Sequence, residues 1–182
     1  NISMHLSRLV QCDLLSVEKQ GRHRYYRFSR QEVAYAIEAL ANLVPHQTAE
    51  RKMTAVADSD IRFCRTCYDH LAGKVGVAIT SALLKQQLIL QNKNAFSLTP
   101  KGRKLFSALG IAIGELEQQR RILLRPCLDW SERQYHMAGS LGAALLDITL
   151  KEGWMRRTRN SCAVIITAKG RQQLHTYFRL DL

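Results

Sequence analysis

The chain has 182 residues, with 27 lysines and arginines against 15 aspartates and glutamates, which gives a formal net charge of +12. Hydrophobic residues make up 46% of the chain, which is enough for a folded core and argues against a wholly disordered chain. No apolar run reaches the roughly 18–20 residues that cross a bilayer, and residues 1–5 lack a secretion-signal pattern. We therefore expect a cytoplasmic protein without a membrane segment. Its excess positive charge favours an anionic partner, first of all nucleic acid.

The first predicted elements are a helix and a basic hairpin. An apolar stripe at helical spacing predicts a helix over residues 2–11. The stripe consists of Ile2, Leu6, Leu9 and Val10. Two short strands are predicted at residues 14–17 and 25–28, joined by a turn around Gly21 that is rich in basic residues.

A second helix is predicted over residues 29–44. Ser29 and Glu32 have the spacing of a capping box, and Pro45 ends the periodic segment. Residues 46–60 are polar and lack a clear period, so we interpret them as a linker.

The rest of the chain contains an internal repeat. Residues 70–79 (HLAGKVGVAI) match residues 136–145 (HMAGSLGAAL), and the motif TxKGR occurs at residues 99–103 and again at 167–171. Each copy is predicted as helix, strand, turn, strand and helix, with Thr99 and Thr167 as natural N-caps of the last helix. The predicted domains are therefore 1–45, a linker at 46–60, a first repeat at 61–114 and a second repeat at 115–182.

One segment resembles a known family. Residues 3–9 (SMHLSRL), 13–15 (DLL) and 18–28 (EKQGRHRYYRF) are similar in order and spacing to the recognition helix and wing of the ArsR/SmtB family. These are bacterial winged helix-turn-helix transcriptional regulators. The resemblance implies a fold that is mainly α with small β-hairpins (α+β), namely a winged helix-turn-helix followed by two winged-helix-like repeats. It also implies a homodimer, joined through helix 29–44, that binds a pseudo-palindromic duplex and usually represses transcription.

The resemblance assigns the DNA contacts to the helix and the wing. The expected DNA-binding residues are Ser3, His5, Ser7, Arg8, Lys19, Arg22, His23 and Arg24. Side chains of a helix in the major groove reach base edges, whereas cations of a wing neutralise phosphates. His5 has the alternative role of holding the turn. The competing function is a winged-helix module that binds protein, because this fold serves both purposes.

The sequence departs from the family in two ways. Family members carry two or three helices before the recognition helix, whereas Asn1 lies almost at its start, so the resemblance implies an amino-terminal truncation. A typical member also ends soon after the dimerisation helix, whereas here about 135 residues follow it.

The cysteines raise the question of a sensor. Their odd number and irregular spacing predict free thiols rather than disulfides. Cys64, Cys67 and His70 form a C-x-x-C motif with a histidine, and on a helix Cys67 and His70 would share a face. Such a group can hold a thiophilic ion such as zinc, cadmium or arsenite. Thiol oxidation and the absence of any cysteine function are the alternatives, and His136, the repeat mate of His70, shows no matched cysteine.

A small organic ligand bound between the two copies is a third possible signal. Aromatic or polarizable residues at similar points of the copies are Cys67, Tyr68, Trp130, Tyr135 and Trp154. The simpler interpretation is that they fill the core. No phosphate loop, Rossmann fingerprint, G-x-S-x-G or H-E-x-x-H motif is present, so we do not expect an enzyme.

Overall fold

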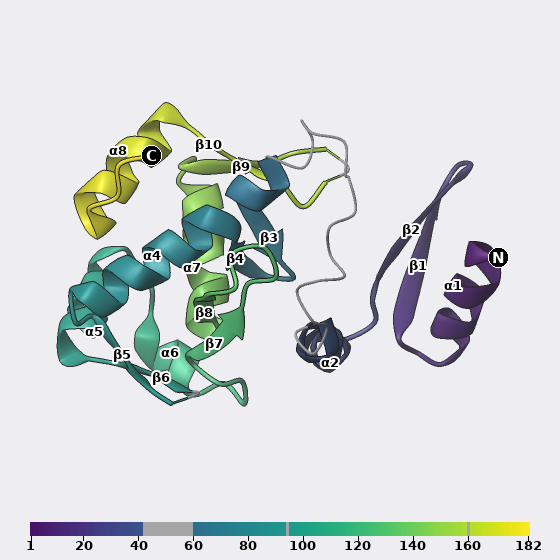
Figure 1. Ribbon diagram of the computed structural model, residues 1–182, viewed down its shortest axis with the longest axis horizontal. Helices are drawn as coiled ribbons and strands as arrows, with labels where there is room; N and C mark the ends of the chain where they lie inside the picture. The colour runs from purple at the N-terminus through teal and green to yellow at the C-terminus, as the bar shows by residue number, and fades with distance from the viewer. Residues whose placement is uncertain (42–59, 94, 160) are drawn as a thin grey trace. The chain divides into compact units, whose positions relative to one another are not determined.

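The computed structural model describes residues 1–41, 60–93, 95–159 and 161–182 (Figure 1). The chain divides into two units, Asn1–Arg51 and Lys52–Leu182, each with its own internal contacts. Among the described residues, no helix is both long enough and apolar enough to cross a membrane. Residues 46–59 of the predicted linker at 46–60, and the predicted helix end at Pro45, lie outside the described residues.

The first unit begins with a helix and a hairpin, as predicted. Helix α1 spans Ile2–Gln11, and strands β1 (Leu15–Gln20) and β2 (His23–Phe28) pair antiparallel. The side chain of Asn1 caps α1 by accepting a hydrogen bond from the backbone N–H of Ser3 at 3.1 Å. Gly21 lies in the two-residue turn at φ +58°, a conformation that glycine adopts without steric cost. Both strands are longer than predicted.

Helix α2 spans Gln31–Ala41, and its start differs from the predicted capping box. The hydroxyl of Ser29 donates to the backbone carbonyl of Asp13, and the guanidinium of Arg30 binds the Asp13 carboxylate. Ser29 and Arg30 therefore tie the approach to α2 to the turn that follows α1. Val33 and Ala34 are the buried residues of the described part of α2.

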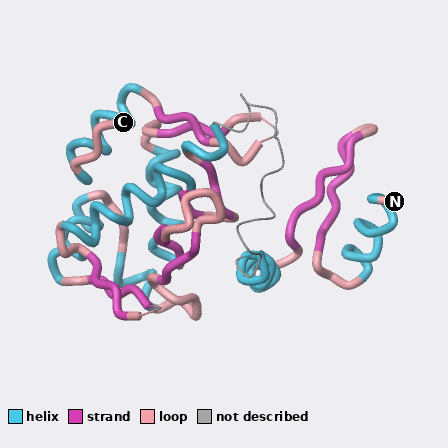
Figure 2. The backbone as a smooth tube through the Cα atoms, viewed as in Figure 1, coloured by secondary structure: helices cyan, strands magenta, loops and turns pink. Residues whose placement is uncertain are grey.

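The second unit runs twice through the same order of elements, namely hairpin, helix, hairpin and helix (Figures 1 and 2). The first series is β3 (Arg65–Cys67), β4 (His70–Ala72), α4 (Gly73–Lys85), β5 (Ile89–Asn92), β6 (Ala95–Leu98) and α5 (Pro100–Ala108). The short helix α6 (Ile113–Glu117) leads to the second series. That series is β7 (Arg125–Leu128), β8 (Tyr135–Ala138), α7 (Ser140–Lys151), β9 (Met155–Arg157), β10 (Val164–Ile166) and α8 (Ala168–Phe178).

The first hairpin of each series was not predicted, and the start of each series differs from the expected helix. His70–Ala72 is strand β4, and the chain turns into α4 only at Gly73. Gly73 has φ +74° and Gly139 has φ +95°, and a Cβ on either would meet a backbone oxygen at 2.5 or 2.6 Å. The two glycines therefore switch the chain from strand to helix, and the strands before them, of three and four residues, are too short to show a periodic pattern.

The last helix of each series starts as predicted. The hydroxyl oxygens of Thr99 and Thr167 accept hydrogen bonds from the backbone N–H groups of Gly102 and Gly170, each at 3.0 Å. This confirms both predicted N-caps.

The two series share one hydrophobic core, because the first helix of each series packs on the first hairpin of the other. Helix α4 packs on β8 of the second series, and α7 packs on β4 of the first. A Cβ on Gly76 would lie 3.6 Å from Cβ of His136, and a Cβ on Gly142 would lie 3.3 Å from Cβ of His70. The second glycine of each H-x-A-G-x-x-G motif therefore makes room for the histidine of the other series.

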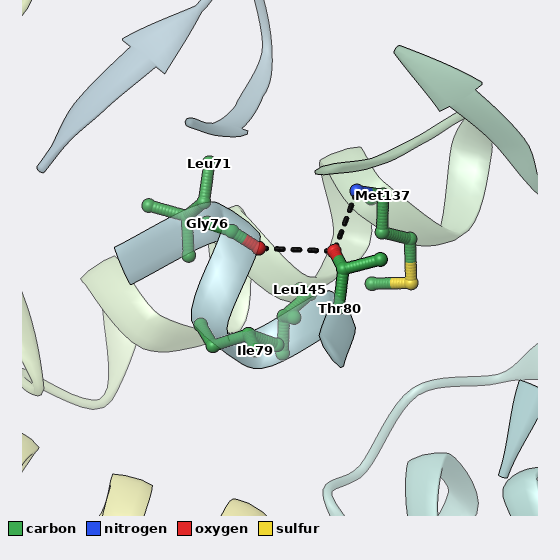
Figure 3. A pocket seen from close by; sticks show the side chains of 7 residues that line it. Leu71, Gly76, Ile79, Thr80, Met137 and Leu145 are labelled. Carbon is green, nitrogen blue, oxygen red and sulfur yellow. Dashed lines mark hydrogen bonds between the residues drawn. The ribbon is translucent and has the colours of Figure 1, made fainter. Parts of the chain in front are cut away.

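A polar side chain joins the two series next to these glycines. Thr80 Oγ1 donates to the carbonyl of Gly76 at 2.9 Å and accepts from the backbone N–H of Met137 at 2.8 Å (Figure 3). The adjoining cavity, which Leu71, Ile79 and Leu145 also line, has a volume of only about 10 Å³. That space holds about one water molecule.

Candidate functional site

The residues expected to bind DNA all lie on α1 and the β1–β2 hairpin, and the side chains of all eight are exposed. Lys19 and Arg24 are direct partners across the hairpin, and Arg22 occupies its turn. Arg27, further along β2, lies 3.6 Å from the Glu18 carboxylate, so part of its charge is offset. The tip of the hairpin therefore presents cations to solvent.

Helix α1 also exposes part of its apolar stripe. The helix has no buried residue, and 78% of the surface of Ile2 and 37% of that of Leu9 are accessible. Because successive residues are rotated by about 100°, Ser7 lies roughly opposite Ile2 and Leu9, and Ser3 and Arg8 lie on the two flanks, about 100–120° from them.

A second candidate site lies in the other unit, where two cysteines and two histidines converge. The ligand atoms of Cys67, His70, Cys127 and His136 all lie within 4.8 Å of one another. Cys127, His70 and His136 are buried, and Cys67 is half-buried. Nε2 of His70 lies 3.1 Å from Nε2 of His136.

The four residues come from the two unpredicted hairpins. Cys67 pairs with His70 across β3–β4, and Cys127 pairs with His136 across β7–β8. The first pair is separated by two residues and the second by eight, so the second hairpin is six residues longer. Each hairpin contributes one cysteine and one histidine in the same cross-strand arrangement.

A carboxylate lies behind each histidine. Nδ1 of His70 is 3.2 Å from Asp69, which accepts two hydrogen bonds from the guanidinium of Arg121 at 2.7 and 3.1 Å. Nδ1 of His136 is 3.2 Å from Asp129, which accepts a hydrogen bond from buried Arg65 at 2.8 Å. Asp129 also accepts from the backbone N–H of Gly73 at 2.7 Å, so residues of both series hold it in place.

These contacts shift the protonation of the group. The hydrogen bond with Cys67, together with those to the two histidines, lowers the pKa of the Cys127 thiol in spite of burial. Burial opposes the charged form of Asp129, but its hydrogen bonds with His136 and Arg65 hold the pKa of this carboxyl well below its usual range. Burial alone would lower the pKa of His136. The hydrogen bonds of this ring with Asp129 and Cys127 outweigh burial, so the pKa of His136 is raised. These shifts favour a thiolate at Cys127 and a protonated ring at His136.

The geometry changes the metal group that the sequence suggested. Cys67 and His70 belong to it, but as partners across a hairpin and not on one face of a helix. Cys64 lies outside it, because its side chain packs in the hydrophobic core, where burial raises the pKa of the thiol to about 12. Cys127 is the cysteine that pairs with His136. The fixed offset between the two repeats did not reveal it, because the loop of the second hairpin is longer and places Cys127 further from its histidine.

The aromatic residues considered as the lining of a ligand cleft have different surroundings. Trp154 is buried and stacks on Tyr177 with ring centroids 5.6 Å apart, whereas Trp130 is 45% exposed and lies against the guanidinium of Arg65. Tyr135 makes an edge contact with Phe96. The two tryptophans therefore have separate packing partners, and the interpretation that these residues fill the core fits Trp154 but not the exposed Trp130.

One comparison with known proteins identifies the class. An uncharacterized HTH-type transcriptional regulator named YdfF, from Bacillus subtilis (strain 168), is 43% identical to this chain over 169 residues. The match covers 93% of this chain and 75% of the relative, so it includes residues of both units. The chain belongs to this family of HTH-type transcriptional regulators. No protein-family model matches the chain, and no solved structure matches it.

Proposed function

We propose that the protein is a DNA-binding transcriptional regulator of the ArsR/SmtB type, in which α1 is the recognition helix and β1–β2 is the wing. The observation that carries the proposal is that all eight expected contact residues are exposed on these adjoining elements of a chain from an HTH regulator family. In this proposal α2 joins two chains into a homodimer that represses transcription from a pseudo-palindromic operator in the cytoplasm.

The polar side of α1 has the chemistry for reading bases. An α-helix fits the major groove, where arginine donates to the O6 and N7 of guanine and serine bonds to several base edges. Ser3 and Ser7 are one turn apart, and Arg8 follows them near the end of the helix. We assign base contacts to these three residues, with His5 beside them.

The wing has the chemistry for holding the backbone. Lys19, Arg22 and Arg24 lie at or beside the two-residue turn of the hairpin. In the strand register no acidic residue is opposite any of them. Cations at such a place bind phosphates and release counterions, which raises affinity for any duplex. The wing therefore supports affinity while α1 supplies sequence preference.

Selection of bound duplexes from a random pool, with the full-length protein, tests the proposal. We expect enrichment of one sequence made of two inverted half-sites about one helical turn apart. Recovery of unenriched random sequence would contradict specific recognition. A matched control is the variant R22A/R24A, which we expect to recover less DNA from the pool without a change in the enriched sequence.

The alternative of a protein-binding module has its own support. The exposure of Ile2, Met4 and Leu9 leaves apolar surface on α1 that a protein partner would cover. In that case the selection yields no enriched sequence, and the substitution Ile2→Ser abolishes an interaction that R22A/R24A leaves intact.

A further inference from the structure

We propose that Cys67, His70, Cys127 and His136 bind one zinc ion, which fastens the two series of the second unit to each other. The inference goes beyond DNA binding by the first unit and does not depend on it. It rests on the distances, burial and partners of these four side chains.

The four ligand atoms already have the spacing of a small tetrahedral site. Zinc bonds of about 2.3 Å to sulfur and about 2.0–2.1 Å to nitrogen place tetrahedral ligands roughly 3.3–3.8 Å apart. Here no two of the four atoms are more than 4.8 Å apart, and the two Nε2 atoms are 3.1 Å apart. Shifts of about 1 Å or less therefore bring all four onto one ion.

The orientation of the histidines calls for a cation between them. Nδ1 of each ring lies 3.2 Å from a carboxylate, so in a neutral ring the hydrogen belongs on Nδ1 and Nε2 is left as an acceptor. The two Nε2 atoms nevertheless point at each other. A metal ion accepts both lone pairs, and the carboxylate–histidine–metal arrangement then occurs twice.

The charges around the site balance when zinc is bound. Two thiolates neutralise the ion, while Asp69 pairs with Arg121 and Asp129 pairs with Arg65. The buried group therefore carries no net charge, and this avoids the large cost of an uncompensated ion in a low-dielectric interior.

The donor set selects the metal and its role. Two thiolates with two imidazoles suit zinc, whereas calcium and magnesium require oxygen ligands. Four protein ligands fill the tetrahedron and leave no position for a reactive water, as in structural zinc sites. Since β3–β4 supplies two ligands and β7–β8 supplies the other two, the ion cross-links the two series.

Elemental analysis of the full chain, purified without chelator, tests the assignment. We expect one zinc per chain, and we expect C127S and H136A to lose it. The matched control is C162S, because Cys162 is an exposed free cysteine outside the group, and this variant should retain the full zinc content. Purified protein without metal, protein that holds copper or cadmium in place of zinc, or zinc retained by C127S and H136A would overturn the proposal.

Two measurements on the unsubstituted chain remain decisive if the variants fail to fold. Cobalt added to the metal-depleted protein should give the intense absorption of a tetrahedral ion, together with thiolate-to-cobalt bands for two sulfurs. Removal of zinc by a chelator should lower the Tm of the second unit by roughly 10 °C. An octahedral cobalt spectrum, an unchanged Tm, or a disulfide between Cys67 and Cys127 would contradict the proposal.

Discussion

His70 and His136 differ from the other described histidines in their burial and in their partners. Among the described histidines, only His70 and His136 are buried, and each has an aspartate at its Nδ1. A buried polar group without a partner costs free energy, so the aspartates fix both the tautomer and the direction of the rings. Both rings are therefore oriented with Nε2 toward the ring of the other histidine.

The partner of His70 provides a prediction at this scale. The D69N variant replaces the charged carboxylate that accepts from Nδ1–H of His70 with a neutral amide. We therefore expect zinc affinity to fall by about 10–100-fold. Competition with a chromogenic chelator measures the change. Asp147 is exposed on α7, away from the group, and D147N should leave the affinity unchanged. Equal affinities for D69N and the unsubstituted chain would show that Asp69 does not orient the ligand.

Substitution of Arg8 distinguishes a contact with a base from a contact with a phosphate. Because Arg8 lies on the polar side of α1, we expect R8A to lose about 1–3 kcal/mol of discrimination at one base pair of each half-site. Its affinity for random duplex should change little. Binding measured on the selected duplex and on its single-base variants checks this. A uniform loss across all sequences would assign Arg8 to a phosphate instead.

At the scale of elements, the sequence was informative where periodicity was long or motifs were repeated. It predicted α1, the β1–β2 hairpin, and the caps at Thr99 and Thr167, because an apolar stripe, a glycine turn and a side-chain cap are all local signals. The strands that were not predicted are short, three residues each in β3 and β4 and four each in β7 and β8, which is too few for a clear alternating pattern.

The candidate metal site was half predictable for the same reason. Cys67 and His70 are neighbours in sequence, but Cys127 joins them only through the packing of two hairpins. The sequence pattern that indicates the site is a cysteine upstream of each HxAG motif, at unequal distances. A hairpin alignment that allows a longer loop would have found Cys127, whereas a fixed repeat offset did not.

The close packing of the two series rests on a few glycines, which leads to a prediction for Gly142. A Cβ at this position would lie 2.7 Å from the carbonyl oxygen of Met137 and 3.3 Å from Cβ of His70. We expect G142A to lower the free energy of unfolding by about 1–3 kcal/mol, because the backbone of β8 must move. Denaturant unfolding measures the loss.

Gly114 in α6 is the matched control for this substitution. A Cβ there would meet no heavy atom within 4 Å, so G114A should leave stability unchanged or slightly increase it. If G142A were as stable as G114A, the close approach of α7 and β4 would not be needed for folding.

At the scale of the whole molecule, the charge of +12 divides between two kinds of surface. The cations of the hairpin tip are exposed and serve the proposed contact with phosphates. Several cations of the second unit are instead paired with carboxylates, as Arg65, Arg103 and Arg121 are. Net charge alone therefore overstates the surface available to DNA, and in the first unit the exposed cations belong to the same unit as α1, the proposed recognition helix.

The salt dependence of binding to the selected duplex tests the central claim that α1 and the wing bind DNA. For the full-length protein, the logarithm of the association constant should fall linearly with the logarithm of salt concentration, with a slope of about −0.9 per phosphate contacted. In R22A/R24A the slope should become shallower by about 0.9 for each phosphate contact that is lost, while the preferred sequence stays the same. An identical slope and affinity for the two proteins would contradict the assignment of the hairpin as a DNA-binding wing.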